Sequence, residues 1–377
     1  MVILAIAYIA MFVGCVLVLN RHGANERQDK IIWGFMAGAL AIIALLFDPT
    51  GTGLDVERHF QRIRMIRNTN ITFSDYVFHR SFGYGGLYVF NAVCYLIAKL
   101  DVSEHILPLL ATLTSYLICF YILRDWTTQE SVNRRYYALS MLICFAFLPY
   151  YFVMCGVRNG VAMCIMGLAI YQYLYRRESV FLFLALGVIA ATIHTSILIS
   201  VPFVLLSKAK LSYRSIGVVF LGSFALGAVS RSLSKMSLPY LSSMAKSYLI
   251  YSSDGQFRSA QYFLTTDIIL ILLFAFLLVK QYGKYLSSLN SGRSTRMYNF
   301  IALYGMYIIG NFGNYDLVLR PAYLFGPLAP MLGSLLYNND YWKGKAGIQL
   351  IVKMGVLLIC GYTVARYMTY FFSIVKI

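Results

Sequence analysis

Residues 182–191 read LFLALGVIAA, and residues 268–279 read IILILLFAFLLV. Neither run alternates apolar and polar residues, so neither fits a membrane barrel, whose strands are alternating segments of about ten residues. Uninterrupted apolar blocks are typical of helices that cross a bilayer. With 59% hydrophobic and only 12% charged residues among 377, the chain is predicted to be an all-α, polytopic membrane protein. We expect one membrane domain over residues 1–377.

The apolar blocks predict about twelve transmembrane helices, since one crossing needs about 20 apolar residues. These helices should begin near Val2, Ile31, His105, Tyr136, Val161, Val180, Thr195, Ile216, Tyr262, Tyr298, Pro321 and Gly347. Cytoplasmic loops favour Lys and Arg, and such residues occupy the connections at 21–30, 124–135 and 176–177. The charge pattern therefore predicts an N-terminus outside the cell. It leaves three long or polar outer stretches, residues 48–104, 231–260 and 311–320.

One further apolar stretch, residues 85–100, does not fit this pattern as a crossing. The alternation of basic loops requires the chain to cross once between residues 49 and 123. We therefore expect residues 85–100 to dip into the membrane or to lie at its surface. The glycines that begin this stretch would permit irregular backbone beside a cavity. The alternative is a thirteenth helix, with one loop assigned to the wrong side.

The net charge of +17 would indicate nucleic-acid binding in a soluble protein, but basic cytoplasmic loops account for it here. The cysteines Cys15, Cys94, Cys144 and Cys164 lie inside apolar runs without paired spacing. We interpret them as packing residues, not as disulfides or metal ligands. His194 has no ligand-type neighbour within two helical turns, so the sequence predicts neither a metal site nor a cofactor.

The first predicted outer loop carries five arginines and no lysine between residues 58 and 80. These are Arg58, Arg62, Arg64, Arg67 and Arg80. Arginine binds phosphate through two parallel N–H donors, whereas lysine would serve equally well if only charge were needed. The loop therefore favours a phosphate-bearing substrate at the outer face. An amphipathic helix at the membrane surface, with one charged side, is the structural alternative.

Three ionisable residues lie at the outer ends of apolar runs, where a charged group is costly and is by default a functional candidate. Arg158 stands where one predicted helix ends and the next begins, His194 lies between two apolar runs, and Arg320 just precedes another. With the loop arginines they would form one outward-facing polar cluster. Structural roles are equally open. Arg158 and Arg320 are candidates to pair with Asp55 or Asp316, and His194 could hydrogen-bond to a neighbouring helix.

Several segments together resemble the EpsG-like branch of the Wzy polysaccharide polymerases. The central block comprises residues 157–162 (VRNGVA), the basic turn 175–177 (YRR) and residues 191–198 (ATIHTSIL). Upstream, residues 51–59 (GTGLDVERH) are similar to the family's Gly-x-Asp-x-x-x-Tyr segment. Downstream, residues 320–325 (RPAYLF) are similar to its late Arg-x-x-Tyr-Phe segment.

Two positions depart from the family pattern. Asn159 stands where the family usually has Gln after the arginine. The family's acidic residue ahead of a Gly-Tyr pair is missing, since His79 and Arg80 precede Gly83 and Tyr84 here. If that acid were the catalytic base, Asp55 or His194 would have to replace it.

The resemblance implies a multi-pass protein of the bacterial plasma membrane that builds O-antigen, capsule or exopolysaccharide. Such enzymes join oligosaccharide repeat units carried on undecaprenyl diphosphate, at the outer or periplasmic face. The implied partners are a lipid-linked oligosaccharide donor and acceptor and membrane lipids. A chain-length regulator and a flippase would be further partners.

The reaction needs charge compensation for the leaving diphosphate and a base for the acceptor hydroxyl. On this resemblance, the groups expected to bind substrate are Arg158, Arg320, Arg58, Arg62, Asn159 and Tyr323. His194 is the first candidate for the base and Asp55 the second, because histidine titrates close to neutral pH. The rival functions are a lipid-linked oligosaccharide flippase or exporter, and another membrane glycosyltransferase that uses a lipid donor.

Overall fold

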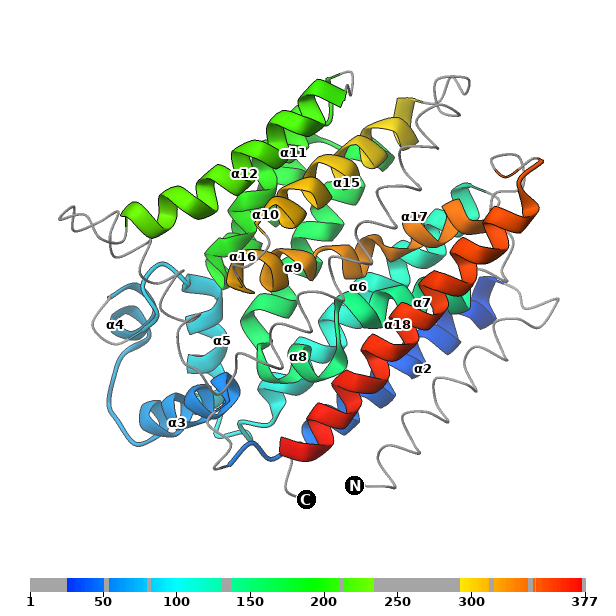
Figure 1. Ribbon diagram of the computed structural model, residues 1–377. Coiled ribbons are helices and arrows are strands. Elements are labelled where there is room, and N and C mark those ends of the chain that lie inside the picture. The colour runs from blue at the N-terminus through cyan, green and yellow to red at the C-terminus, as the bar shows by residue number, and fades with distance from the viewer. Residues whose placement is uncertain are drawn as a thin grey trace.

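The computed structural model describes residues 26–50, 54–79, 83–130, 137–209, 213–233, 292–311, 315–337, 342 and 344–374 (Figure 1). Every regular element in these ranges is a helix, and they contain no strand. The predicted all-α fold is therefore confirmed. The expected helices near Val2 and Tyr262, and most of the expected outer stretch 231–260, lie outside the described residues.

Seventeen helical elements are described along the chain, and residues 234–291, between α12 and α15, lie outside the description. In order they are α2 (Glu26–Leu45), α3 (Asp55–Arg67), α4 (Phe73–Phe78), α5 (Tyr88–Lys99), α6 (Ile106–Gln129), α7 (Tyr137–Phe147), α8 (Tyr150–Cys155), α9 (Val157–Ile170), η2 (Tyr171–Arg176), α10 (Val180–Ile193), η3 (Thr195–Ser200), α11 (Val201–Leu206), α12 (Tyr213–Leu233), α15 (Gly292–Gly310), α16 (Tyr315–Ala322), α17 (Phe325–Tyr337) and α18 (Ala346–Ile374). A helix begins close to each of the ten predicted starts that the structure describes.

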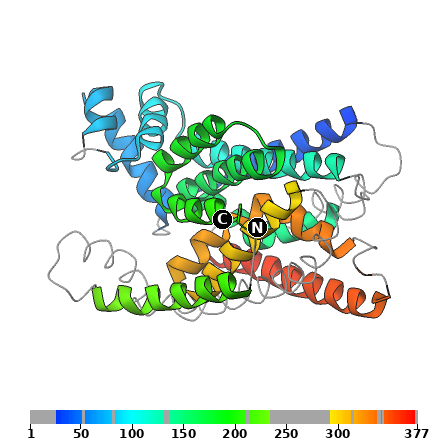
Figure 2. The ribbon, with the colours of Figure 1, turned by 90° about the horizontal axis from the view of Figure 1, so that it is seen from above.

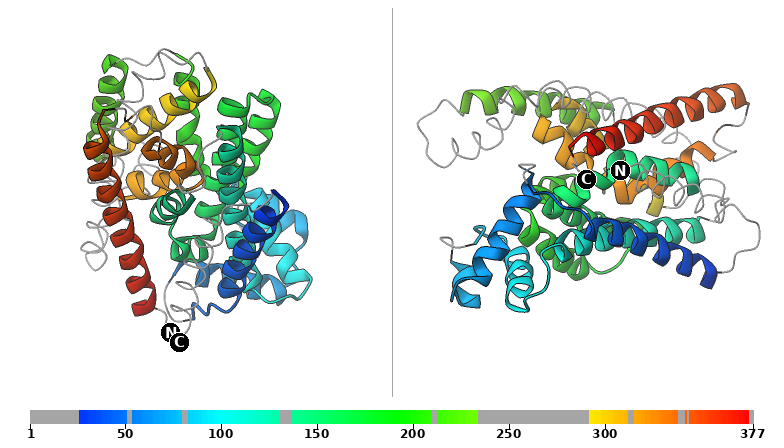
Figure 3. Two further views of the ribbon diagram at one scale, coloured as in Figure 1. Left: turned by 90° about the vertical axis from the view of Figure 1, so that its right-hand side faces the viewer. Right: turned by 90° about the horizontal axis from the view of Figure 1, so that it is seen from below.

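The centre of the molecule is built around α6, which packs against α2, α9 and α17. Helix α7 packs on α17 and α18, and α12 packs along α15. In Figures 2 and 3, α12 and α18 lie on one side of the molecule, and α2 with α3–α5 lies on the other. Small residues allow the closest approach, because a Cβ on Gly333 of α17 would lie 2.1 Å from Ser140 Oγ of α7.

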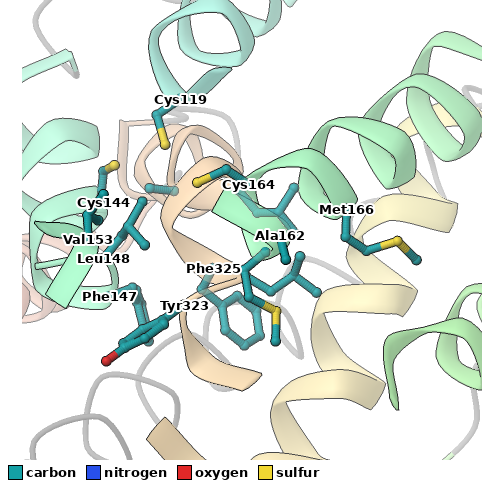
Figure 4. Close-up of a cluster of buried hydrophobic side chains, with 14 of the residues drawn as sticks. Cys119, Cys144, Phe147, Leu148, Val153, Ala162, Cys164, Met166, Tyr323 and Phe325 are labelled. Atoms are coloured by element: carbon teal, nitrogen blue, oxygen red, sulfur yellow. The ribbon is translucent and has the colours of Figure 1, made fainter. Parts of the chain in front are cut away.

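A cluster of apolar side chains fills the space between these helices (Figure 4). The described cysteines, which include Cys94, Cys144 and Cys164, are buried and free of disulfides, as predicted for packing residues. Cys15 lies outside the described residues. Tyr323 belongs to this cluster, where its ring packs 5.8 Å from the ring of Phe152.

Two of the described helices are long and apolar enough to cross a membrane, residues 106–129 and 346–369. Other apolar helices are shorter, among them Val180–Ile193 and Tyr137–Phe147. The second of these stops where Pro149 follows, because proline lacks the N–H donor that a helix needs and disfavours a helical residue before it. The count of about twelve crossings therefore stays a prediction.

Helices α3, α4 and α5 form a separate group at one end of the molecule (Figures 1 and 2). Both α3 and α4 pack on α5, and α5 in turn packs on α10. Helix α5 has 12 residues and is therefore about 18 Å long, well short of a hydrocarbon core of about 30 Å. Helices α7 and α10 are similarly short, so the dip or surface location of residues 85–100 stays a prediction. We call α3–α5 and their connections the outer group.

Candidate functional site

The first turn of α3 presents Asp55 to two arginines. Arg58 Nη2 lies 3.1 Å from Asp55 Oδ1, one helical turn along α3. Arg158 Nη2 donates a hydrogen bond of 3.1 Å to Asp55 Oδ2 from the first turn of α9. The carboxylate therefore joins the outer group to a helix that lies 103 residues further along the chain. One of the two structural roles open for Arg158, a pair with Asp55, is present.

His59 lies on the buried side of α3, one turn after Asp55. Its Nδ1 lies 2.7 Å from the hydroxyl of Tyr84. Its Nε2 lies 3.2 Å from Asp55 Oδ2, an ion-pair distance without the alignment of a hydrogen bond. Burial lowers the pKa of His59 despite the opposing effect of Asp55, so we infer a neutral ring. With its proton on Nε2 facing the carboxylate, Nδ1 accepts the hydrogen bond from Tyr84.

The backbone N–H and the carbonyl of Tyr84 both bond to Asn91, and its ring contacts two guanidinium groups. Its N–H donates to Asn91 Oδ1 at 3.0 Å, and Asn91 Nδ2 donates to its carbonyl at 2.9 Å. Arg62 Cζ lies 3.7 Å from the centre of its ring, and Arg158 Cζ lies 4.4 Å from it. These are cation–π distances. Arg62 comes from α3 and Arg158 from α9, so this ring brings together charges from two parts of the fold.

His194 occupies the turn between α10 and η3, where it caps η3. The backbone N–H of Ser196 donates to its Nδ1 at 3.2 Å, and the Ser196 hydroxyl lies 2.8 Å from the same atom. That hydroxyl is also 3.4 Å from Asn159 Oδ1 in the first turn of α9. Because Nδ1 accepts a backbone hydrogen bond, it carries no proton. The neutral ring therefore holds its proton on Nε2.

Arg320 approaches this region from α16, which packs against η3. Burial, together with the positive charges of Arg320 and Arg158, lowers the pKa of His194 to about 3. For Asp55, burial alone would raise the pKa, but the contacts with His59 and Arg158 outweigh burial and hold the pKa well below its usual range. Both groups therefore respond to the same concentration of positive charge.

We call Asp55, Arg58, His59, Arg62, Tyr84, Arg158, His194 and Arg320 together the Asp55 cluster. Arg62 and Arg158 act electrostatically on His59 and Tyr84, Arg158 and Arg320 act on His194, and Asp55 is a carboxylate that acts on all three of these groups. Arg58, Arg62 and Arg158 bring three positive charges to the region of one carboxylate, that of Asp55, which leaves a surplus. The N-terminal end of α9 adds a partial positive charge. The cluster is thus suited to an anion that carries more than one charge.

The chain matches a known protein family over most of its length. The model of the EpsG family matches residues 57–373. The chain belongs to the EpsG family. EpsG-like proteins are polymerases of the Wzy type, so this chain is a membrane protein of a glycosyltransferase-like polymerase family. Searches of curated proteins and of solved structures gave no match.

In this EpsG family member, the five loop arginines divide between two environments. Arg58 and Arg62 belong to the Asp55 cluster. Arg64 Nε lies 2.6 Å from Glu104 Oε1, and Arg67 Nε lies 2.8 Å from Asp101 Oδ1. Arg80 lies outside the described residues. The Arg64–Glu104 and Arg67–Asp101 pairs fasten the end of α3 to the connection before α6, so Arg64 and Arg67 act as structural clasps.

The other expected site residues are also placed. Asn159 lies beside Ser196 at the edge of the cluster, whereas Tyr323 is buried among aromatic rings. Asp316 has no described side chain. The described residues contain no group of three His, Cys, Asp or Glu that could hold a metal ion.

Sequence reasoning missed His59, Tyr84 and Ser196. A signal for His59 was available, since it stands four residues after Asp55 and so shares its side of a helix. The sequence around Ser196 resembles a helix start, but it does not show that His194 Nδ1 accepts the hydrogen bond from the Ser196 N–H. Tyr84 follows a glycine in an irregular connection, and its ring meets Arg62 and Arg158 only through the folding of the outer group onto α9 and α10.

Proposed function

We propose that this protein joins oligosaccharide repeat units carried on undecaprenyl diphosphate, at the outer face of the bacterial plasma membrane. The observation that carries the proposal is the Asp55–Arg158 pair within a surplus of guanidinium charge. A diphosphate esterified at both ends carries one negative charge on each phosphate. Arginine is the side chain best suited to bind such groups.

The chemistry is a glycosyl transfer. The hydroxyl oxygen of the acceptor unit attacks the anomeric carbon of the donor glycan, and a new glycosidic bond forms. The bond from that carbon to the diphosphate oxygen breaks, and the diphosphate leaves with its electron pair on the lipid carrier. The hydroxyl proton moves to a base. The protein must therefore stabilise the departing anion and accept one proton.

The arginines supply the first requirement. Arg158 is central, since its side chain is only 17% exposed and so acts in a weakly screened environment. Arg62 contacts the same Tyr84 ring as Arg158, and Arg320 acts on the same region from α16. Arg58, with 58% of its side chain exposed, stands at the edge. We assign Arg62, Arg158 and Arg320 to the diphosphate and Arg58 to its entry.

For the second requirement, the contacts favour Asp55 over His194. His194 already accepts a backbone hydrogen bond at Nδ1 and carries its proton on Nε2, so it has no lone pair available in this arrangement. Asp55 is held ionised by Arg58 and Arg158. An incoming diphosphate competes for those guanidinium groups, and as they turn to it the pKa of Asp55 rises. Donor binding would thus convert Asp55 into a better proton acceptor.

The proposed orientation rests on α6. The Arg64–Glu104 pair places α3 next to the N-terminal end of this helix. Near its other end, Arg176 Nε lies 3.7 Å from Asp125 Oδ2, beside the basic connection 124–135. A helix of 24 residues is about 36 Å long, enough to separate two membrane faces. Basic connections favour the cytoplasm, so the Asp55 cluster is assigned to the outer face.

The test uses the full-length protein in lipid nanodiscs, supplied with diphosphate-linked repeat units as both donor and acceptor. We expect a ladder of longer glycans on a gel. Arg158→Ala should abolish it, and Arg64→Ala, a matched loss of an arginine from the clasp, should retain it. If instead no ladder forms and the units are scrambled across vesicles, the protein is a flippase and the polymerase proposal fails.

A further inference from the structure

The ring of Tyr84 is the one aromatic side chain of the outer group that contacts guanidinium groups from two helices in the described structure. Arg62 approaches to 3.7 Å from α3 and Arg158 to 4.4 Å from α9. Since both contact one ring, the two guanidinium groups are no more than about 8 Å apart and repel each other, and the electron-rich ring offsets part of that repulsion. Contact with a ring face also uses none of the N–H donors, so those donors stay available for an anion.

The ring has little freedom to move. Its hydroxyl donates to His59 Nδ1, and Asn91 holds the backbone on both sides of the residue. The preceding Gly83 is packed so closely that a Cβ there would lie 2.3 Å from the carbonyl oxygen of Tyr76. His59 is buried and lies beside Asp55. Backbone, hydroxyl and ring are therefore all fixed relative to the Asp55–Arg158 pair.

Both guanidinium groups retain donors that no protein group satisfies. Nη1 of Arg62 and Nε of Arg158 are buried and make no hydrogen bond within the described part of the chain. Buried donors without partners are costly. A fixed ring here contacts two charged groups whose buried donors are costly to leave without partners. This arrangement is expected of a site prepared for a ligand.

We propose that Tyr84 is a positioning residue that holds Arg62 and Arg158 side by side as a paired diphosphate-binding unit. This inference rests on the proposed function for the identity of the anion. The role is one of positioning because the ring contacts the arginines, and the arginines contact the substrate. His59 completes the device by fixing the hydroxyl of Tyr84.

The outer group offers a matched control in Tyr95. It also carries a cation over its ring, with Lys99 Nζ 5.8 Å from the centre, and its hydroxyl donates to the carbonyl oxygen of Ile71 at 3.3 Å. It packs against Tyr76 and Phe73, within the same helices. Replacing Tyr95 therefore removes a comparable ring from the outer group without touching the two arginines.

The experiment compares Tyr84→Leu, Tyr84→Phe and Tyr95→Leu in nanodiscs by two measurements. The first is the rate at which phenylglyoxal modifies Arg62 and Arg158, followed by mass spectrometry. The second is the pair of constants kcat and KM for ladder formation. Tyr84→Leu should speed modification of both arginines several-fold and raise KM about tenfold, because two cation–π contacts are lost. Tyr84→Phe keeps the ring, so its modification rates should stay within about twofold of wild type.

The outcomes separate the two proposals. If Tyr84→Leu leaves both arginines as slowly modified as in wild type, the positioning role is wrong even when ladders form normally. Equal effects of Tyr95→Leu and Tyr84→Leu would also overturn it, since any ring of the outer group would then serve. Should Tyr84→Leu fail to fold, full exposure of the arginines in Tyr84→Phe would refute the role of the ring. If the arginines respond as expected but wild type makes no ladder, the positioning role stands and the polymerase proposal fails.

Discussion

The two halves of α3 carry the same residue type and use it differently. In the second half, Arg64 and Arg67 are matched by Glu104 and Asp101, so each positive charge has a nearby carboxylate. In the first half, Arg58 shares Asp55 with Arg158 from another helix, and Arg62 lies over the ring of Tyr84. The first arrangement balances charge and fastens the chain, whereas the second leaves positive charge in surplus. Arginine content alone therefore does not distinguish the two arrangements, whereas the placement of carboxylates in three dimensions does.

The largest contrast is expected from removing the shared arginine. Arg158→Ala should lower kcat/KM for polymerisation about 100- to 1,000-fold, since it removes a preorganised charge at the departing oxygen. Steady-state rates of ladder growth give the value, and size-exclusion chromatography reports on folding. Activity within tenfold of wild type would mean that the surplus charge of the first half of α3 serves another purpose.

Replacing the shared acid should also have a large effect, but of a different kind. Asp55→Asn keeps the shape and removes the proton acceptor, so kcat should fall about 100-fold. KM for the donor should not rise, because the arginines lose a competing anion. In His194→Gln we expect less than a tenfold loss of kcat. The reverse order of these two variants would assign the base to His194.

Acid should weaken the first half of α3 before the second. The folded-state pKa of His59 lies below its ordinary value of 6.5, so the unfolded chain takes up a proton first as the pH falls. The stability that neutral His59 contributes is fully present above about pH 6.5 and is lost as the pH falls below that value. The pKa of Glu104 is also lowered from its ordinary value of 4.5. The clasp therefore keeps its contribution to stability above about pH 4.5 and loses it only as the pH falls below that value.

The measurement for this prediction is the Tm in nanodiscs between pH 7.5 and pH 5. We expect Tm to fall with pH in wild type and to fall less steeply in His59→Gln. The slope should shrink but persist, because His194 is also held neutral and contributes over the same interval. An unchanged slope in His59→Gln would show that folding does not lower the pKa of His59.

The smallest effect is expected in the clasp. Arg64→Ala removes a pair whose arginine side chain is 51% exposed, so the free energy of unfolding should fall by only about 1 kcal/mol. Ladder formation should stay within about twofold of wild type. A loss of activity comparable with that of Arg158→Ala would erase the distinction between the two halves of α3.

Much of the fold could be predicted from the apolar blocks, and less of the site. Unbroken runs such as residues 182–191 indicate helices whatever their neighbours, and α10 forms there. The length of a helix depends on local breaks such as Pro149, which is why the number of crossings did not follow from composition. The partners of Arg64 and Arg67 depend on α5 folding back beside α3. No pattern within residues 55–67 contains that information.

The site residues divide in the same way. Arg158 and His194 were identified because charged or polar groups stand out in apolar surroundings, whereas Asp55 was identified as a candidate partner of Arg158 and through the segment 51–59 that is similar to the family pattern. The structure brings the three residues together. The function expected for His194 rested on its ordinary titration range. Its use as the cap of η3, and the lowering of its pKa by burial and neighbouring arginines, arise only in the folded chain. Tyr323 shows the converse, a motif residue that faces the apolar interior.

The Asp55–Arg158 bond has a mechanical consequence. It is a fastening between the outer group and the bundle, and it is also the contact that an arriving diphosphate must break. Each catalytic cycle would therefore begin by loosening the fastening and end by restoring it once the carrier departs. Glu104 and Asp101 bind the far end of α3 through separate contacts, so the attachment of that end does not depend on the Asp55–Arg158 bond.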